Sequence, residues 1–172
     1  MTCSKMIAGF LSVLCLAGVI SAEQGIGLQA DMIGQGLVYR LLSASGVGIE
    51  MVGRVYVFPS GNRLEYNARG ELRVLKLFNP DRRVRFFIGG GAGYWRIQDW
   101  DYYWDGDDYT YSWETRWGTS VAALLGFDVI VVQMEDGSGL TLMPEVQLGY
   151  YTFRYEDMWI GPGVGIGLRY VW

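Results

Sequence analysis

The sequence predicts an all-β protein, a closed antiparallel up-and-down barrel of eight strands. Seven segments alternate apolar and polar residues with period two, which is typical of strands whose two faces meet different surroundings. Glycine supplies 25 of the 172 residues and aromatic side chains 15%, as expected for many strands joined by tight turns. Clusters of Gly, Pro, Asn, Asp and Ser separate the segments.

The strands are placed from the end of the chain backwards. The alternating segments are 159–172, 140–155, 116–133, 83–98, 63–78, 47–58 and 35–43. A closed antiparallel barrel whose two ends lie on the same side needs an even number of strands, so an eighth is assigned to 25–32. Its outward residues are expected to be Ile26, Leu28 and Ala30, with Gln29 and Asp31 facing inward. The boundary between this strand and 35–43 is assigned from the even strand number, because no clear turn signal separates the two.

Residues 1–22 are predicted to be a cleaved signal peptide. Lys5 gives a positive start, 6–20 is apolar, and Ser21 and Ala22 offer the small residues of a cleavage site. A retained membrane anchor is the alternative, but the apolar run is shorter than the about 20 residues that a spanning helix needs. The remaining residues, 23–172, are expected to form one domain.

Composition excludes several classes of function. The sequence has no histidine, which removes His-based triads, His metal sites and His acid–base catalysis. Both cysteines, Cys3 and Cys15, lie in the predicted signal, so no disulfide is expected in the exported domain. Without Lys5 the chain keeps 13 bases against 18 acids, a net charge of −5, and such an acidic chain is a poor partner for nucleic acid.

The polar face of the strands is rich in charged residues. This charge predicts that the polar face points to the interior of the barrel. Its bases are all arginine, whose planar fork suits enclosed pairs with carboxylates. Asp31 shares this face, and the predicted ion-pair network consists of Arg40, Glu50, Arg54, Glu65, Arg69, Glu71, Arg73, Arg85, Asp128, Glu145 and Arg169. A polar interior with an apolar exterior is the pattern of a barrel in lipid, where a sheet must close because unpaired backbone groups are costly.

The last twelve residues, 161–172, carry a recognisable pattern. Apolar residues alternate from Val164 onward, and the segment ends in two aromatics. With Gly165, Gly167, Tyr170 and Trp172 it resembles the closing strand of bacterial outer-membrane β-barrels, although that family often has a polar residue where Gly165 stands. The whole of 23–172 resembles the small eight-stranded barrels of the OmpA/OmpX type.

That resemblance implies a location and partners. It implies insertion in the outer membrane of a Gram-negative cell envelope, contact with outer-membrane lipid, and recognition of Gly165, Gly167, Tyr170 and Trp172 by the barrel-assembly machinery. If the C-terminus is periplasmic, the short turns at 44–45, 79–82 and 134–139 face the periplasm. The long loop predicted at 99–115 then lies outside the cell, as in that family.

The predicted loop at 99–115 combines aromatic and acidic residues without a base. Its candidate binding residues are Asp101, Trp104, Asp105, Asp107, Asp108 and Trp113. Carboxylates near the Asp-Gly turn would suit a calcium ion, but their spacing does not match an EF-hand. The aromatic faces would suit a sugar or an extracellular ligand or partner. The favoured interpretation is a solvated external loop whose aromatics sit at the headgroups.

The sequence therefore favours a structural or surface-interaction protein without enzymatic activity, cofactor or metal. Glu65, Glu71 and Glu145 could in principle supply paired carboxylates for glycoside chemistry. An eight-stranded interior is filled by side chains, however, and equal numbers of arginines favour a plug of ion pairs. The alternative function is a soluble periplasmic barrel of lipocalin-like kind that binds a small apolar ligand.

Overall fold

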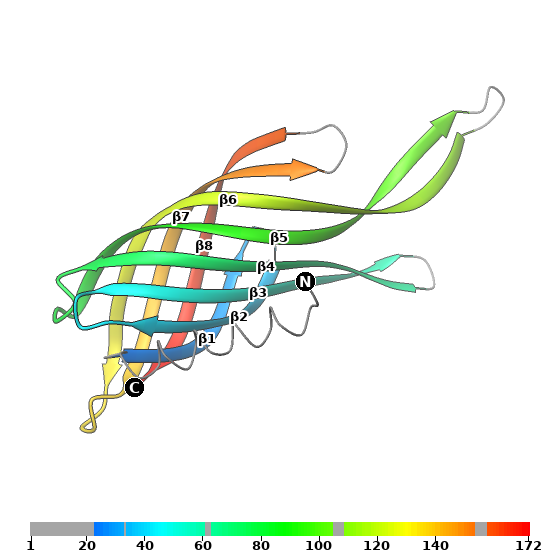
Figure 1. Ribbon diagram of the computed structural model, residues 1–172. Coiled ribbons are helices and arrows are strands. Elements are labelled where there is room, and N and C mark those ends of the chain that lie inside the picture. The colour runs from blue at the N-terminus through cyan, green and yellow to red at the C-terminus, as the bar shows by residue number, and fades with distance from the viewer. Residues whose placement is uncertain (1–22, 33, 61–62, 105–108, 154–157) are drawn as a thin grey trace, which may run out of the picture.

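The computed structural model describes residues 23–32, 34–60, 63–104, 109–153 and 158–172. Its strands are β1 (Glu23–Asp31), β2 (Gly34–Leu42), β3 (Val47–Ser60), β4 (Arg63–Phe78), β5 (Val84–Trp104), β6 (Tyr109–Gln133), β7 (Gly139–Phe153) and β8 (Met158–Val171). Each strand pairs antiparallel with the next, and the order closes into a barrel (Figure 1). The predicted all-β, closed, eight-stranded antiparallel barrel is confirmed.

The first and last strands close the sheet. β1 and β8 pair from Gly25 opposite Val171 to Asp31 opposite Gly165. Below this ladder, Gln24 and Trp172 exchange two backbone hydrogen bonds, both of 2.9 Å. Over residues 25–31 and 165–171 each border strand therefore has a partner, which is the condition for a sheet in an apolar solvent.

The division of the first two strands, inferred from parity, is also confirmed. β1 ends at Asp31 and β2 begins at Gly34, and these two residues are opposite one another. The Asp31 carboxylate accepts a hydrogen bond of 3.1 Å from the Gly34 N–H, so the side chain itself stabilises the reversal. β1 begins at Glu23, two residues earlier than the sequence analysis placed it.

The predicted loop at 99–115 is wrong over most of its length. β5 continues to Trp104 and β6 begins at Tyr109, so 99–104 and 109–115 are strand. The register sets Trp100 opposite Trp113 and Tyr102 opposite Tyr111. Acidic residues on β5 and mainly Thr and Ser on β6 alternate with aromatics here. Aromatic residues favour paired strands, so the composition that suggested a loop is compatible with a hairpin. The β5–β6 hairpin extends well beyond the other strands (Figure 1).

Three short turns lie at the same end of the barrel as the C-terminus (Figure 1). In the first, Gly46 has a φ of +79° and a Cβ there would strike the Leu77 carbonyl, so glycine is required. In the last, the hydroxyl and the backbone N–H of Ser138 donate to the Asp136 carboxylate at 2.6 and 3.0 Å. These bonds hold the pKa of Asp136 below its ordinary value.

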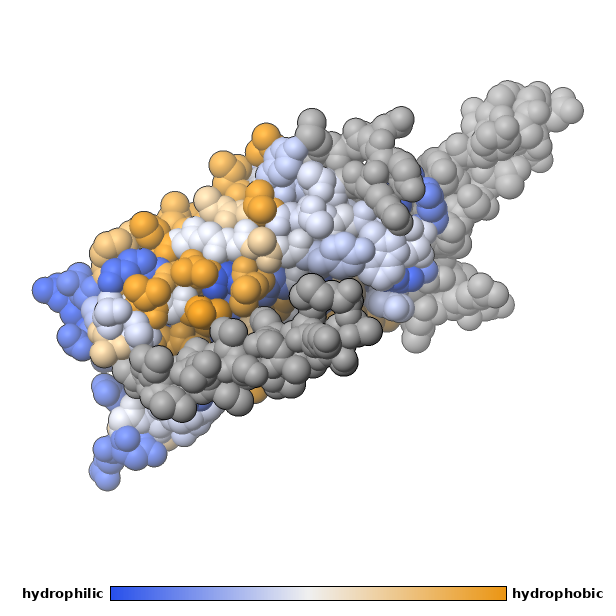
Figure 2. All heavy atoms as spheres, viewed as in Figure 1, coloured by the Kyte–Doolittle hydropathy of each residue, from blue (hydrophilic) through white to orange (hydrophobic). Residues whose placement is uncertain are grey.

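The two faces of the sheet have opposite polarity to those of a water-soluble protein. Leu28 and Ile160 on the outer wall are 64% and 65% exposed, whereas Arg40 inside is 0% exposed. Ile26, Leu28 and Ala30 face outward and Gln29 is buried, as predicted for the first strand. Apolar residues gather on the visible barrel wall, and hydrophilic residues gather at the end with the short turns (Figure 2). Large apolar surfaces of this kind need a partner other than water.

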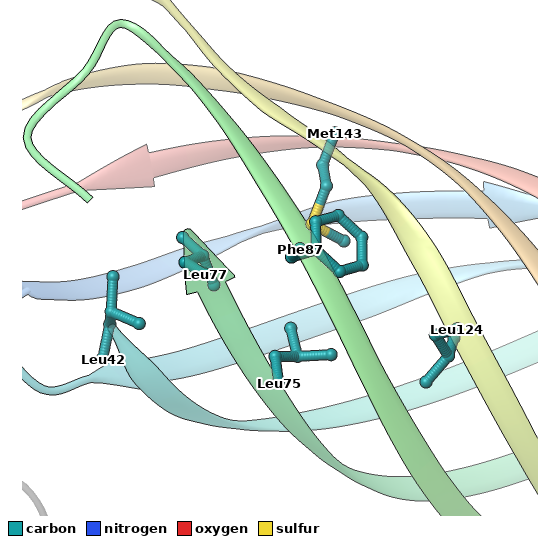
Figure 3. Close-up of a cluster of buried hydrophobic side chains, with 6 residues drawn as sticks. All are labelled: Leu42, Leu75, Leu77, Phe87, Leu124 and Met143. Carbon is teal, nitrogen blue, oxygen red and sulfur yellow. The ribbon is translucent and has the colours of Figure 1, made fainter. Parts of the chain in front are cut away.

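The interior is not uniformly polar. Six apolar side chains form a buried cluster near the short turns: Leu42, Leu75, Leu77, Phe87, Leu124 and Met143 (Figure 3). They occupy inward positions of β2, β4, β5, β6 and β7, in phase with the charged residues. The sequence analysis assigned charge to this face and did not identify the cluster.

Candidate functional site: the charged interior

The predicted ion-pair residues come together in the interior. Arg69, Glu71 and Arg73 alternate along β4 and therefore share its inner face. Across β3 and β4, Glu50 is opposite Arg73, and across β5 and β6, Arg85 is opposite Asp128. Except for Glu65, whose side chain lies outside the described residues, every predicted member is buried and takes part in an ion pair.

One group of pairs lies near the short turns. Arg40 bridges Glu50 at 2.8 Å and Asp128 at 2.5 Å, so its guanidinium links β3 to β6 across the interior. Arg85 pairs with the same Asp128 at 2.7 Å, and Arg169 pairs with Glu50 at 2.7 Å. Each of these two carboxylates is therefore shared by two arginines, which makes the group a network rather than a set of isolated pairs.

A second group is centred on Glu71. Its carboxylate pairs with Arg54 at 2.8 Å, Arg73 at 3.0 Å and Arg69 at 3.2 Å. Arg73 also reaches Glu145 at 3.0 Å, and a longer contact of 3.7 Å to Glu50 connects the two groups. Arg73 is thus the junction of the whole interior network.

Two carboxylates complete the network. Arg54 pairs with Asp31 at 3.0 Å, and Arg85 pairs with Glu23 at 2.6 Å. Six arginines then face six carboxylates, so the connected network is electrically neutral. Buried charges are tolerated only when paired and hydrogen-bonded in this way. Sequence reasoning missed Glu23, although it stands in phase with Gln29 and Asp31 on β1, and that parity was the available signal.

Inward glycines make room for these long side chains. A Cβ on Gly91 would lie 3.0 Å from Arg73, and one on Gly165 would lie 3.2 Å from Glu145. A Cβ on Gly163 would come within 2.7 Å of Gln147. β5 and β8 thus supply bare backbone where other strands supply guanidinium and carboxylate groups, which gives a physical reason for glycine in both segments.

Aromatic residues cover the network toward the long hairpins. The guanidinium of Arg69 lies 5.2 Å from the ring centre of Tyr151, and Trp95 is 6% exposed with its indole N–H donating to the Thr119 carbonyl at 3.3 Å. Toward the short turns, Met143 of the apolar cluster contacts Arg40 and Arg169, so the cluster lies among the ion pairs (Figure 3). The charged interior is therefore covered toward the long hairpins, whereas at the other end the network reaches Glu23, whose side chain is 21% exposed.

The other predicted site residues are placed as follows. Gly165 and Gly167 are inner-face positions of β8, whereas Tyr170 and Trp172 face outward with ring centres 5.8 Å apart. Recognition of these four by assembly machinery stays a prediction. In the hairpin, Asp101 and Trp104 belong to β5 and Trp113 to β6, and nothing is described of their side chains. Asp105, Asp107 and Asp108 lie outside the described residues, as do Cys3, Cys15 and the predicted signal peptide.

The described residues offer neither a metal site nor a membrane-spanning helix. Within these ranges no group of three or more Cys, Asp or Glu side chains is arranged to hold a metal ion. In the same part of the chain, no helix is long and apolar enough to cross a membrane.

Fold and interior together define a closed eight-stranded antiparallel barrel with an apolar wall and a neutral, ion-paired core. No protein-family profile matches the chain, and no curated protein matches it. Among solved structures it is similar to the N-terminal β-barrel domain of Pseudomonas aeruginosa OprF, with 11% identity and a TM-score of 0.47. The match covers 87% of this chain and 98% of that one.

Proposed function

We propose that this chain is an integral outer-membrane β-barrel with a structural or surface-interaction role and no enzymatic activity. The observation that supports it is the inverted polarity: apolar side chains on the outside of a closed sheet and paired charges inside. In water that wall would be a large exposed apolar surface, and in lipid it is the solvated face. Closure leaves no sheet edge to be desolvated.

Outward aromatic pairs support the same placement. Tyr170 and Trp172 stack at the end with the short turns, and Tyr94 stacks on Trp117 at 5.5 Å toward the long hairpins. Tyrosine and tryptophan favour the two membrane interfaces because one part of each ring system is apolar and another part is polar. With the short turns in the periplasm, the β5–β6 hairpin is external and is the part best placed to meet a ligand or partner.

The test combines fractionation with topology. The mature protein should require detergent for extraction, migrate differently on gels when unboiled, and show β-type circular dichroism. An epitope inserted at 105–108 should be accessible to antibody on intact cells, whereas the same epitope at 134–138 should become accessible only after the outer membrane is opened. Recovery in the aqueous periplasmic fraction would instead support a soluble lipocalin-like barrel.

A second expectation is that the barrel conducts ions poorly. Arg40 and Arg73 span the interior through pairs with residues of other strands, and aromatic side chains cover the network toward the long hairpins. A filled eight-stranded interior leaves no aqueous channel. Planar-bilayer recordings should give no steady single-channel current from the purified protein, and large, stable openings would contradict the plug.

The predicted assembly signal is tested by Trp172→Ala. The backbone bonds of residue 172 to Gln24 do not need the ring, and its stack on Tyr170 is half exposed, so the loss of stability should not exceed about 1.5–3 kcal/mol. The variant should refold in detergent but reach the outer membrane poorly in cells. Tyr94→Ala is the matched control, because Tyr94 is also outward and stacked. Equal membrane levels of the two variants would make Trp172 a simple anchor.

A further inference from the structure

The outer wall of the barrel is hollowed between β2 and β5. Gly53 and Gly70 are opposite one another on β3 and β4 and face outward, and a Cβ at either would meet nothing within 4 Å. They belong to an open groove of about 720 Å³, whose other outward lining residues include Met51, Leu72, Ala92 and Tyr94. On a wall otherwise covered by large apolar side chains, this groove is a shaped recess for an apolar chain.

Arg96 lies on β5 two residues beyond Tyr94, which lines this groove. Tyr94 is opposite Gly70, and the next outward position of β5 is Arg96, opposite Ala68. The guanidinium of Arg96 lies 4.2 Å from the ring centre of Tyr66 and 5.8 Å from that of Trp117. One of its nitrogens donates to the Tyr66 carbonyl at 2.7 Å. These contacts fix the guanidinium over aromatic faces at the border of the apolar wall.

Arg96 keeps donors for a ligand. A guanidinium has five N–H groups, and besides the Tyr66 carbonyl the only other protein acceptor in the described residues is Thr115 Oγ1, at 3.4 Å. No carboxylate of the residues whose side chains are described pairs with it, in contrast to the arginines inside the barrel. Arg96 lies beside an apolar groove, so the two together suit a molecule with an anionic head group and a hydrocarbon chain.

We propose that this surface binds a phosphate-bearing lipid, with the phosphate on Arg96 and one acyl chain in the groove of Gly53 and Gly70. The proposal rests on the membrane location proposed above. Phosphate suits the site because its oxygens accept bidentate hydrogen bonds from a guanidinium fork, and because an arginine is always charged. Lys76, another outward cation of the described residues, donates to the Ser45 carbonyl at the opposite end of the barrel and lies four residues from Leu72, the nearest groove residue on β4.

The test is lipid retention by the purified barrel in detergent micelles, read by native mass spectrometry during titration. The probes are dioleoyl phosphatidic acid, dioleoylglycerol with the same chains and no phosphate, and inorganic phosphate. Wild type should retain phosphatidic acid, and neither of the other two probes should replace it at equal concentration. Arg96→Gln should weaken retention by at least about tenfold, the equivalent of one charge-assisted hydrogen bond. Gly70→Leu, which fills the groove, should weaken it as well.

Lys76→Gln is the matched control and should bind phosphatidic acid as wild type does. Unboiled gel mobility of every sample reports separately whether the barrel is folded, so a failed lipid site is distinguished from a failed membrane barrel. Unchanged retention in Arg96→Gln or in Gly70→Leu would overturn the proposal. Equal retention of dioleoylglycerol would reduce the groove to ordinary lipid contact, and displacement by inorganic phosphate alone would leave an anion site without a chain; either result also overturns it.

Discussion

Replacing Arg73 with alanine is expected to lower the free energy of unfolding of the barrel by about 3–5 kcal/mol. Arg73 pairs with Glu71 and Glu145 at 3.0 Å and contacts Glu50 at 3.7 Å, and the side chains of these residues are almost fully buried. The alanine leaves surplus negative charge in an enclosed space. Removing one partner of a buried pair costs more than the pair contributes, because the remaining charge stays desolvated.

The measurement is urea unfolding of the barrel refolded in detergent or vesicles, followed by unboiled gel mobility. Arg116→Ala is the control, because Arg116 pairs with Glu114 at 3.4 Å where both are partly exposed, and it should cost no more than about 1 kcal/mol. The double variant Arg73→Met with Glu145→Gln should recover part of the loss. A cost for Arg73→Ala similar to that of Arg116→Ala would mean that water reaches the interior and the plug is not dry.

Replacing Gly126 with valine is expected to cost about 1–3 kcal/mol or to prevent closure. Gly126 is an inward position of β6, opposite Phe87 on β5, and a Cβ there would lie 2.7 Å from the Phe87 ring and closer still to the Pro144 carbonyl. The ring lies over the bare backbone, so a side chain must displace either Phe87 from the apolar cluster or β7 from its ladder.

Gly70→Val is the matched control for this variant. It is also a strand glycine, but it faces outward into open space, so the new side chain meets no neighbour. Valine favours strands over glycine, and the change should therefore be neutral or slightly stabilising. Both variants are compared by unfolding midpoint in urea at the same detergent concentration. If Gly126→Val were as stable as Gly70→Val, the close packing of Phe87 on β6 would be refuted.

Much of this fold could be predicted because period two is a strict signal. Arg69, Glu71 and Arg73 alternate with outward residues on β4, and this alternation alone places all three inside. The eighth strand followed from parity, because a closed antiparallel sheet whose two chain ends lie on the same side must have an even number of strands. Neither inference requires knowledge of which side chains are in contact.

Other features depend on geometry that alternation does not contain. Which carboxylate Arg40 reaches is set by the width of the barrel, since Asp128 lies on a strand that does not pair with β2. The sequence predicts a loop around Trp100 and Trp113 because its acidic residues resemble those of solvated loops, whereas the register sets these two residues opposite one another on paired strands. Glu23 was missed because it adjoins the predicted cleavage site, although its parity with Asp31 was visible.

The seam between β1 and β8 has a consequence for the order of folding. Every other pairing joins strands that follow each other in the chain, whereas Gln24 meets Trp172 across almost the whole described sequence. The entropy lost on joining two segments grows with the chain between them, so we expect neighbouring hairpins to form first and this contact to form last. Until then the molecule is a curved sheet with two exposed borders. The final step is the pairing of β1 with β8. Any factor that speeds this pairing shortens the lifetime of the open sheet, which is prone to aggregation.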